Sequence, residues 1–198
     1  MIIFSRSTLR EALNGLRVLK LSKNVMPIYS HVLVFGYETF VEFDATDLDQ
    51  YLRYTGEGAS TEATRLLVPM DVLQTASKTS DANAEIRITG GEEPSISYLV
   101  GGAALSVPFN TLPVGDFPEK PVAEGETIAF PSGVLGAMNE ALACASTDIT
   151  RYILNGVYLD AHAVVATDGR QLYRRNSLEL AVPQGSIFPL SGVPRHPP

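Results

Sequence analysis

Three aspartates stand close together in the first quarter of the chain, at a spacing that could serve a metal-dependent hydrolase. They are Asp44, Asp47 and Asp49, in the stretch FDATDLDQ. Carboxylate oxygens are the ligands that Mg²⁺ and Ca²⁺ prefer in proteins. Alternation along a strand, however, would place Asp47 and Asp49 on one face and Asp44 on the opposite face. The spacing makes a poor cage for a cation, so the sequence disfavours this class of enzyme.

Other residues with catalytic or metal-binding chemistry are sparse. The chain has one cysteine and three histidines that stand far apart, and it contains no CxxC, HExxH or GxxxxGK[ST] pattern. A zinc centre or a Ser-His-Asp triad needs several such residues together. We therefore expect no cofactor, no metal and no catalytic residue.

Basic residues gather near the N-terminus. Five of them stand within residues 6–23 against the single acidic Glu11, which gives 5 − 1 = +4 there, whereas the chain as a whole carries −7. These five are Arg6, Arg10, Arg17, Lys20 and Lys23. A basic face on an acidic body can bind a polyanion locally, although a solvated amphipathic helix would account for the same charges.

Hydrophobic periodicity divides the first 110 residues into helices and strands. Residues 7–21 place apolar side chains at helical spacing, with Ser7 as the expected N-cap, and a second helix is expected over residues 70–80. Alternating β-formers predict short strands over residues 30–37, 40–46, 49–58, 64–69, 84–89, 95–100 and 104–109.

The phrase ATDLDQYLRY at residues 45–54 returns as ATDGRQLYRR at residues 166–175. The surrounding order returns too, because residues 132–146 match 7–21, residues 151–160 match 26–35, and SIFP at 186–189 matches LLVP at 66–69. We infer an internal repeat of about 120 residues. In each copy the aspartate, Asp47 or Asp168, is placed to accept backbone N–H bonds in the turn after a strand.

Residues 110–126 are rich in proline, lack periodicity and are interpreted as a linker. We expect a first domain at 1–118, a linker at 119–127 and a second domain at 128–198. The strands equivalent to residues 84–109 would fall beyond residue 198, so the second repeat is expected to be truncated. The fold class is α+β, with two helices packed on an antiparallel sheet in each repeat.

The stretch RYILNGVYL, followed by VVATDGRQL, closely resembles the bacterial DNA polymerase III beta subunit, or sliding clamp, family. The family carries an R-x-x-L-N-G strand and an ATDGHRL motif in its second domain. MPIYSHVLV and FNTLPVGDFP are similar to the family's L-P-I-L strand and its T-L-P-x-x-D-F-P junction between domains one and two. The resemblance covers residues 1 to about 190. Family subunits have three such domains and pair head to tail into a ring.

The resemblance implies a non-catalytic processivity factor that encircles duplex DNA and tethers the replicative polymerase. Its helices would face phosphates without reading base sequence. Lys23 falls at a position where the family has a basic residue that touches DNA. The implied DNA-binding residues are Arg6, Arg10, Arg17, Lys20, Lys23 and Lys78. The second copy departs from this pattern, since residues 132–146 contain Glu140 and no Lys or Arg.

The resemblance also implies a pocket in the second domain for a short hydrophobic peptide from the polymerase and the clamp loader. Its residues map onto Leu154, Thr167, Gly169, Arg170, Gln171 and Leu172. The family's His-Arg after ATDG is replaced here by Arg170 and Gln171.

The expected partners are double-stranded DNA, the polymerase III catalytic subunit, the clamp loader and a second copy of the chain. A cytoplasmic location is expected, because the sequence shows neither a membrane span nor a signal peptide. The alternative function is a clamp-like fragment that binds peptide partners but cannot close a ring.

Overall fold

The chain forms two compact units, Met1–Val122 and Ala123–Pro198. The computed structural model describes residues 1–19, 26–48, 50–78, 83–122, 129–176 and 185–189. The basic residues Lys20 and Lys23 and the aspartate Asp49 lie outside these described residues. Each unit is described by itself below.

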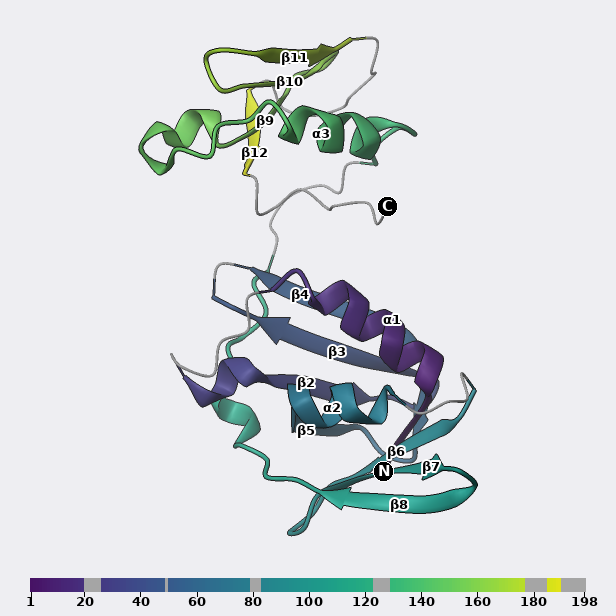
Figure 1. Cartoon of the computed structure of the whole chain (residues 1–198). Coiled ribbons are helices and arrows are strands. Elements are labelled where there is room, and N and C mark those ends of the chain that lie inside the picture. The colour runs from purple at the N-terminus through teal and green to yellow at the C-terminus, as the bar shows by residue number, and fades with distance from the viewer. Residues whose placement is uncertain (20–25, 49, 79–82, 123–128, 177–184, 190–198) are drawn as a thin grey trace. The chain divides into compact units, whose positions relative to one another are not determined.

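Unit 1 is built on an eight-stranded antiparallel sheet with the strand order β5-β2-β3-β4-β1-β6-β7-β8 (Figure 1). The strands are β1 (Ile2–Ser5), β2 (His31–Gly36), β3 (Phe40–Thr46), β4 (Tyr51–Ser60), β5 (Thr64–Pro69), β6 (Glu85–Thr89), β7 (Ser95–Val100) and β8 (Ala103–Pro108). A short 3-10 helix, η1 (Pro27–Ser30), precedes β2. The seven strands expected from alternation are confirmed, and β1 is an addition that the periodicity did not indicate.

Two α-helices, α1 (Arg6–Leu16) and α2 (Met70–Ala76), lie on the same face of this sheet (Figure 1). The expected cap Ser7 is wrong by two residues. The N-cap is Ser5, whose side chain accepts a hydrogen bond from the Thr8 backbone N–H at 3.1 Å. Ser5 ends β1, so the chain passes from strand to helix without a loop, and the last residue with extended backbone becomes the cap.

The alternation along β3 sorts its side chains between the two faces of the sheet. Val41, Phe43 and Ala45 are buried beneath the helices, in one core with Ile2, Leu9 and other apolar residues. Glu42 and Asp44 alternate with them and therefore point to the opposite face, which we call the outer face. The apolar side of α1 and the helix-facing side of the sheet together form the core that fixes the position of α1.

The segment that follows β8 packs against unit 1, so the interpretation of residues 110–126 as a linker is wrong for their first part. Phe117 is buried with Ile28, Tyr29 and Leu67, and Leu112 packs against the same cluster. A 3-10 helix, η2 (Val114–Asp116), shapes this segment. Leu112 and Phe117 therefore belong to a second, smaller core on the outer face of the sheet.

Unit 2 has a four-stranded antiparallel sheet in the order β11-β10-β9-β12, within the residues that the structure describes. The strands are β9 (Gly156–Leu159), β10 (Val164–Thr167), β11 (Leu172–Arg175) and β12 (Ser186–Pro189). The helix α3 (Val134–Leu142) packs on this sheet through Val134, Ala137, Met138 and Ala141. A 3-10 helix, η3 (Ile149–Leu154), precedes β9.

The order β12-β9-β10-β11 in unit 2 repeats the order β5-β2-β3-β4 in unit 1. The helix α3 corresponds to α1, as the matching sequence stretches predicted. Both units thus share one arrangement of helix on antiparallel sheet. Among the described helices, none has the length and the hydropathy needed to cross a membrane.

Candidate functional site

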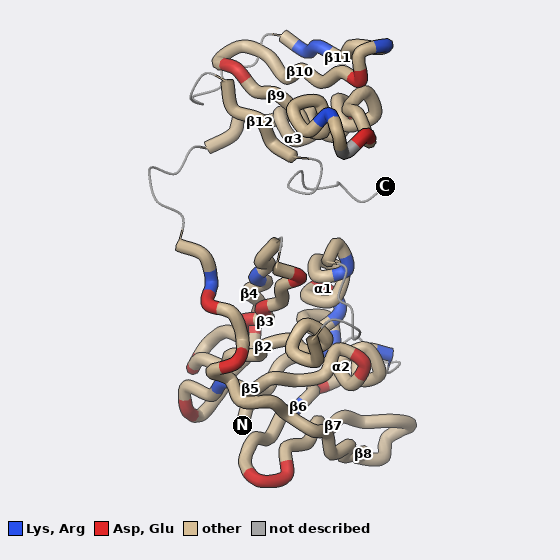
Figure 2. The backbone as a smooth tube through the Cα atoms, turned by 90° about the vertical axis from the view of Figure 1, so that its left-hand side faces the viewer, with Lys and Arg blue, Asp and Glu red and all other residues tan. Residues whose placement is uncertain are grey.

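The arginines of α1 form a stripe along one side of the helix. At about 100° per residue, Arg6, Arg10 and Arg17 fall within roughly 40° of one another, and Glu11 falls about 100° further round. Arg10 and Arg17 are exposed. Glu11 accepts a hydrogen bond from the Tyr54 hydroxyl of β4 at 2.6 Å. The helix therefore separates its cations from its carboxylate, and Figure 2 shows the basic residues along α1.

Tyr54 holds Glu11 away from this stripe. Burial of Tyr54, together with its hydrogen bond to Glu11, raises the pKa of the tyrosine hydroxyl to about 12. The hydroxyl therefore stays protonated and remains a donor to Glu11 at neutral pH.

Arg6 differs from the other basic residues of α1, because it has a structural partner. It is only 9% exposed, and its Nε donates to the backbone carbonyl of Ser77 at 2.7 Å. Ser77 is the C-cap of α2, whose last carbonyls lack helical partners. Arg6 therefore joins the start of α1 to the end of α2, and its role as a phosphate ligand stays a prediction.

A groove with a volume of about 520 Å³ runs between α1 and α2. Arg17 lines it from α1 and Lys78 from the end of α2, and both side chains are exposed. Asn14, Gln74 and Ser77 add neutral polar groups to its walls. Leucine and methionine side chains line the rest of the groove. The structure thus brings Arg17 and Lys78, 61 positions apart in the sequence, to one groove of mixed polar and apolar lining.

The two Ala-Thr-Asp turns have nearly the same hydrogen bonds. In unit 1, Asp47 Oδ1 accepts from the Gln50 backbone N–H at 2.9 Å, and Thr46 Oγ1 donates to the Gln50 carbonyl at 2.8 Å. In unit 2, Asp168 Oδ1 accepts from the backbone N–H groups of Arg170 and Gln171, at 2.8 and 2.9 Å. The turn expected from the repeated phrase is confirmed in both copies.

The backbone donors in the second turn also affect the aspartate's ionisation. The N–H groups of Gln171 and Arg170 lower the pKa of Asp168, since they stabilise its ionised carboxylate. The carboxylate therefore stays ionised and keeps this turn closed at neutral pH.

The six residues mapped to a peptide pocket gather at one end of the unit 2 sheet. Thr167 ends β10 and pairs with Leu172, which begins β11, while Leu154 lies two residues before β9. Gly169, Arg170 and Gln171 form the turn between β10 and β11. Leu172 is 66% exposed, and Ile153 and Ile187, which sequence reasoning did not select, are 59% and 45% exposed. Exposed apolar side chains therefore stand beside the exposed Arg170 and Gln171 in this part of unit 2.

The helix α3 lacks the basic stripe of α1. Its Glu140 accepts a hydrogen bond from the Tyr173 hydroxyl and lies 3.8 Å from Arg175 Nη1. At the positions matching Arg10 and Arg17, α3 carries Leu135 and Leu142. The lack of Lys and Arg in residues 132–146 thus leaves α3 without the exposed basic side chains that α1 carries.

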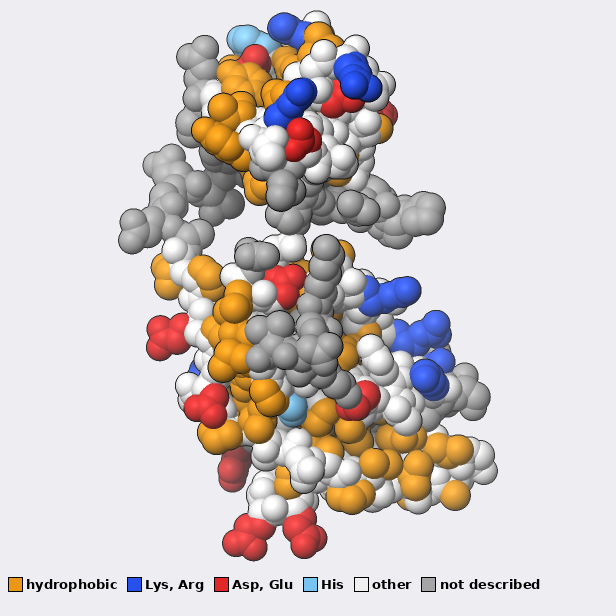
Figure 3. All heavy atoms as spheres, turned by 60° about the vertical axis from the view of Figure 1, so that its left-hand side comes forward, with side chains coloured by type: hydrophobic (Ala, Val, Ile, Leu, Met, Phe, Trp, Pro, Cys, Tyr) orange, Lys and Arg blue, Asp and Glu red, His pale blue; other side chains and the backbone are white. Residues whose placement is uncertain are grey.

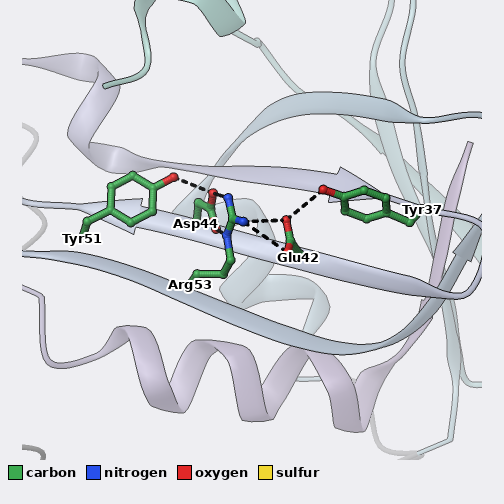
Figure 4. A network of polar contacts seen from close by, with 5 residues as sticks. All are labelled: Tyr37, Glu42, Asp44, Tyr51 and Arg53. Carbon is green, nitrogen blue, oxygen red and sulfur yellow. Dashed lines mark hydrogen bonds and ion pairs between the residues drawn. The ribbon is translucent and has the colours of Figure 1, made fainter. Parts of the chain in front are cut away.

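The aspartates that suggested a metal site have other partners. Asp44 is buried on the outer face, where Arg53 Nε and Nη2 donate to its two oxygens at 2.7 and 2.6 Å (Figure 4). The Tyr51 hydroxyl also donates to Asp44, and Arg53 Nη1 donates to Glu42 Oε1 at 3.2 Å. Asp47 closes the turn described above. Within the described residues no group of three metal-ligating side chains occurs.

Comparison with known proteins gives relatives of one kind, although no family model matches the chain. The chain is 25% identical over 206 residues to the beta sliding clamp of Caulobacter vibrioides, covering 98% of this chain and 52% of that protein. It is 26% identical over 179 residues to the beta sliding clamp of Chlamydia pneumoniae, covering 86% of this chain and 47% of the relative. The chain thus spans about half the length of the curated relatives it matches.

Solved structures agree with these relatives. A Bartonella birtlesii sliding clamp bound to griselimycin superposes with a TM-score of 0.78 at 27% identity, over 95% of this chain and 53% of that one. The Pseudomonas aeruginosa DNA polymerase III subunit beta gives the same TM-score at 21% identity, over 98% of this chain and 55% of that one. The resemblance to beta sliding clamps is confirmed. The fold expected from it, repeated α+β clamp domains, is that of the chain.

Proposed function

We propose that this chain is a non-catalytic sliding-clamp subunit, or part of one, that holds a replicative DNA polymerase on duplex DNA. The observation that carries the proposal is the agreement with beta sliding clamps in sequence and in fold over nearly the whole chain. In this role the chain would act in the cytoplasm, beside the chromosome. The polymerase III catalytic subunit, the clamp loader and a second copy of the chain would be its partners.

The proposed DNA surface is the exposed basic side of α1 and α2. Arg10 is exposed on α1, Arg17 is exposed at its C-cap, and Lys78 is exposed two residues after α2. The groove between the helices adds neutral hydrogen-bond donors. Lys20 and Lys23 belong to the proposal by sequence, although they lie outside the described residues. Such side chains bind phosphates through charge, which suits a protein that must slide past every base sequence.

The salt dependence of duplex binding tests this surface. Fluorescence anisotropy would give the slope of log affinity against log salt for the 198-residue chain and for the variants Arg10→Gln, Arg17→Gln and Lys78→Gln. Each lost phosphate contact should make the slope shallower by about 0.9, with no change in sequence preference. Lys120→Gln is the matched control, because Lys120 is an exposed cation outside both helices. Equal slopes for the helix variants and for the unchanged chain would contradict the assignment.

The proposed peptide site is the exposed apolar end of the unit 2 sheet, formed by Leu154, Thr167, Gly169, Arg170, Gln171 and Leu172. It would receive a short hydrophobic segment of the polymerase or the clamp loader. We propose griselimycin, which is bound in the Bartonella clamp structure, as the probe for this site. Leu172→Ser should weaken griselimycin binding about 10-fold to 100-fold in calorimetry, the scale of a lost apolar anchor. Unchanged affinity in this variant would remove Leu172 from the site.

A further inference from the structure

Three aromatic rings stand in a row on the outer face of unit 1, where a hairpin joins β2 to β3. The ring centroids of Phe35 and Tyr37 lie 3.9 Å apart, and those of Tyr37 and Phe40 lie 4.1 Å apart. All three residues are half-buried. The Tyr37 hydroxyl donates to Glu42 at 3.2 Å, and Phe35 pairs with Glu42 across the strands, which places the rings on the outer face (Figure 4). We call these three residues the aromatic row.

The hairpin turn itself does not require aromatic residues beside it. Tyr37 and Phe40 flank a turn of two residues, and the Tyr37 backbone N–H donates to the Phe40 carbonyl at 2.9 Å. In unit 2, Asp160 and Ala163 flank a turn of the same length, with the equivalent hydrogen bond at 3.0 Å. A turn of this kind therefore closes with an aspartate and an alanine at these positions, and turn geometry does not account for the aromatic row.

The aromatic row has a cation at one end and carboxylates at the other. The guanidinium carbon of Arg65 lies 4.4 Å from the centroid of the Phe35 ring. At the opposite end, Glu57 pairs directly with Phe40 across β3 and β4, so the two side chains lie on one face. Glu38 stands in the hairpin turn, next to the same end. The Phe40 end of the row is therefore acidic.

The carboxylates at this end differ from the buried carboxylate of the same face. Glu42 is 8% exposed and accepts from Arg53 Nη1 at 3.2 Å. Glu38 and Glu57 are exposed, and within the residues that the structure describes they make no ion pair. On the visible face of unit 1, Figure 3 shows the Lys and Arg side chains gathered on one side and most Asp and Glu side chains away from them. Two carboxylates beside the aromatic row can thus attract a cation of a ligand.

We propose that the Phe40 end of the aromatic row binds an arginine-bearing peptide segment of a partner protein. The guanidinium would stack on the Phe40 ring and donate to Glu38 or Glu57. Arg65 on Phe35 is an internal example of the same stacking. Arginine suits the site better than lysine, because its planar group stacks on a ring and donates to a carboxylate together. The surface belongs to unit 1 alone, on the sheet face opposite α1, and it goes beyond the proposed function.

The first experiment uses the unchanged 198-residue chain and the peptide GSRGSRGSRG with blocked ends. NMR spectra would follow the aromatic ring signals during titration up to about 1 mM peptide, the range of weak binding, at about 0.05 M salt, where charges are weakly screened. We expect the ring signals of Tyr37 and Phe40 to shift. A peptide with lysine in place of arginine should bind about 2-fold to 5-fold weaker. A peptide with citrulline, which keeps the planar end group without the charge, should give no shifts.

Three results of this titration would overturn the inference. The first is the absence of shifts at Tyr37 and Phe40 with the arginine peptide. The second is equal binding of the arginine and citrulline peptides. The third is a shift of the same ring signals with a single-stranded oligothymidylate in place of the peptide, since stacked rings can also bind bases.

Matched variants separate this site from the general negative charge of the chain. Glu38→Gln combined with Glu57→Gln should abolish the shifts. Glu92→Gln combined with Glu93→Gln removes two exposed carboxylates between β6 and β7 and should leave the shifts in place. Phe40→Leu keeps an apolar side chain without a ring face and should weaken binding about 3-fold to 10-fold. Equal effects of the two double variants, or unchanged affinity in folded Phe40→Leu, would overturn the assignment.

Arg65 gives a test in the opposite direction. Arg65→Gln uncovers the Phe35 ring and removes a like charge, so it should strengthen binding of the arginine peptide about 2-fold to 3-fold. Arg87→Gln removes another exposed arginine of unit 1 and should have a smaller effect. Weaker binding in Arg65→Gln would show that the aromatic row does not receive cations.

A duplex-binding measurement keeps this inference apart from the proposed function. Phe40→Leu should leave the slope of log affinity against log salt for duplex DNA unchanged, because the aromatic row lies on the sheet face opposite α1. Failure of the arginine peptide to bind, with the slope still dependent on Arg10 and Arg17, would reject this inference and leave the proposed function standing. A changed slope in Phe40→Leu would assign the row to the DNA surface and overturn the inference.

Discussion

At the scale of single residues, the two Ala-Thr-Asp turns differ at one strained position. The residue after the aspartate adopts a left-handed backbone in both copies, with φ of 78° at Leu48 and 89° at Gly169. Glycine tolerates this conformation, whereas a leucine Cβ meets the following carbonyl. Leu48→Gly should therefore stabilise unit 1 by about 1 kcal/mol, because Leu48 is 63% exposed and gives up little packing. Urea denaturation followed by circular dichroism would measure the change.

The reverse substitution is the control for that prediction. A Cβ at Gly169 would meet only the Arg151 guanidinium, at an ordinary contact distance of 3.5 Å. Gly169→Leu should therefore destabilise unit 2 through backbone strain alone, again by about 1 kcal/mol. Equal stability of all three proteins would show that the turn relaxes to accept leucine.

The ion-pair network on the outer face carries a second prediction at this scale. Arg53 neutralises Asp44 and Glu42, which are both buried (Figure 4). Arg53→Met would leave two carboxylates buried without a cation, which should cost about 3 kcal/mol of unfolding free energy. The matched variant Arg87→Met removes an exposed pair with Glu85 and should cost less than about 1 kcal/mol. Similar losses in the two variants would contradict a special role for the buried network.

Arg6 shows what a charge pattern cannot predict. Its position in a basic run indicated a phosphate ligand, but its guanidinium is buried against the Ser77 carbonyl. That partner lies 71 positions further along the chain, and no local periodicity indicates it. The repeated turn was predictable for the opposite reason, since its hydrogen bonds join residues at most four positions apart.

At the scale of elements, periodicity predicted the two helices of unit 1, the helix α3 and most strands. These elements have regular patterns of apolar residues, and their apolar faces are buried in the core of their own unit. The packing of residues 111–117 against unit 1 was not predicted. These residues have no periodicity, and they contact η1, β4 and β5, which lie far from them in the sequence. For the proposed peptide site, sequence matching selected Leu154 and Leu172 but did not select the exposed Ile153 and Ile187.

The contrast between α1 and α3 gives a prediction for an element. Leu135 on α3 matches Arg10 on α1 and is already 41% exposed. If α3 faces phosphate as we propose for α1, Leu135→Arg should steepen the slope of log affinity against log salt by about 0.9. Tyr152→Arg adds the same charge on η3, away from α3, and should change the slope less. An unchanged slope for Leu135→Arg would restrict the phosphate surface to unit 1.

At the scale of the whole molecule, the two units have separate cores, one around Leu9 and Phe43 and the other around Met138 and Leu159. Neither cluster contains residues from the other unit. Each unit therefore has the apolar interior that independent folding requires.

Truncation would measure how much residues 111–117, which follow β8, stabilise unit 1. A fragment of residues 1–122 keeps the docked segment, whereas a fragment of residues 1–110 loses Leu112 and Phe117 and uncovers Ile28, Tyr29 and Leu67. We expect the longer fragment to fold with the NMR signals of unit 1 in the full chain. The shorter one should lose about 3–5 kcal/mol of unfolding free energy, the scale of burying two large apolar side chains. Adding a peptide with the sequence of residues 110–118, NTLPVGDFP, in trans should restore part of that loss, because a ligand that binds only the folded state stabilises it. Equal stability of the two fragments would mean that residues 111–117 cover unit 1 without contributing to its folding.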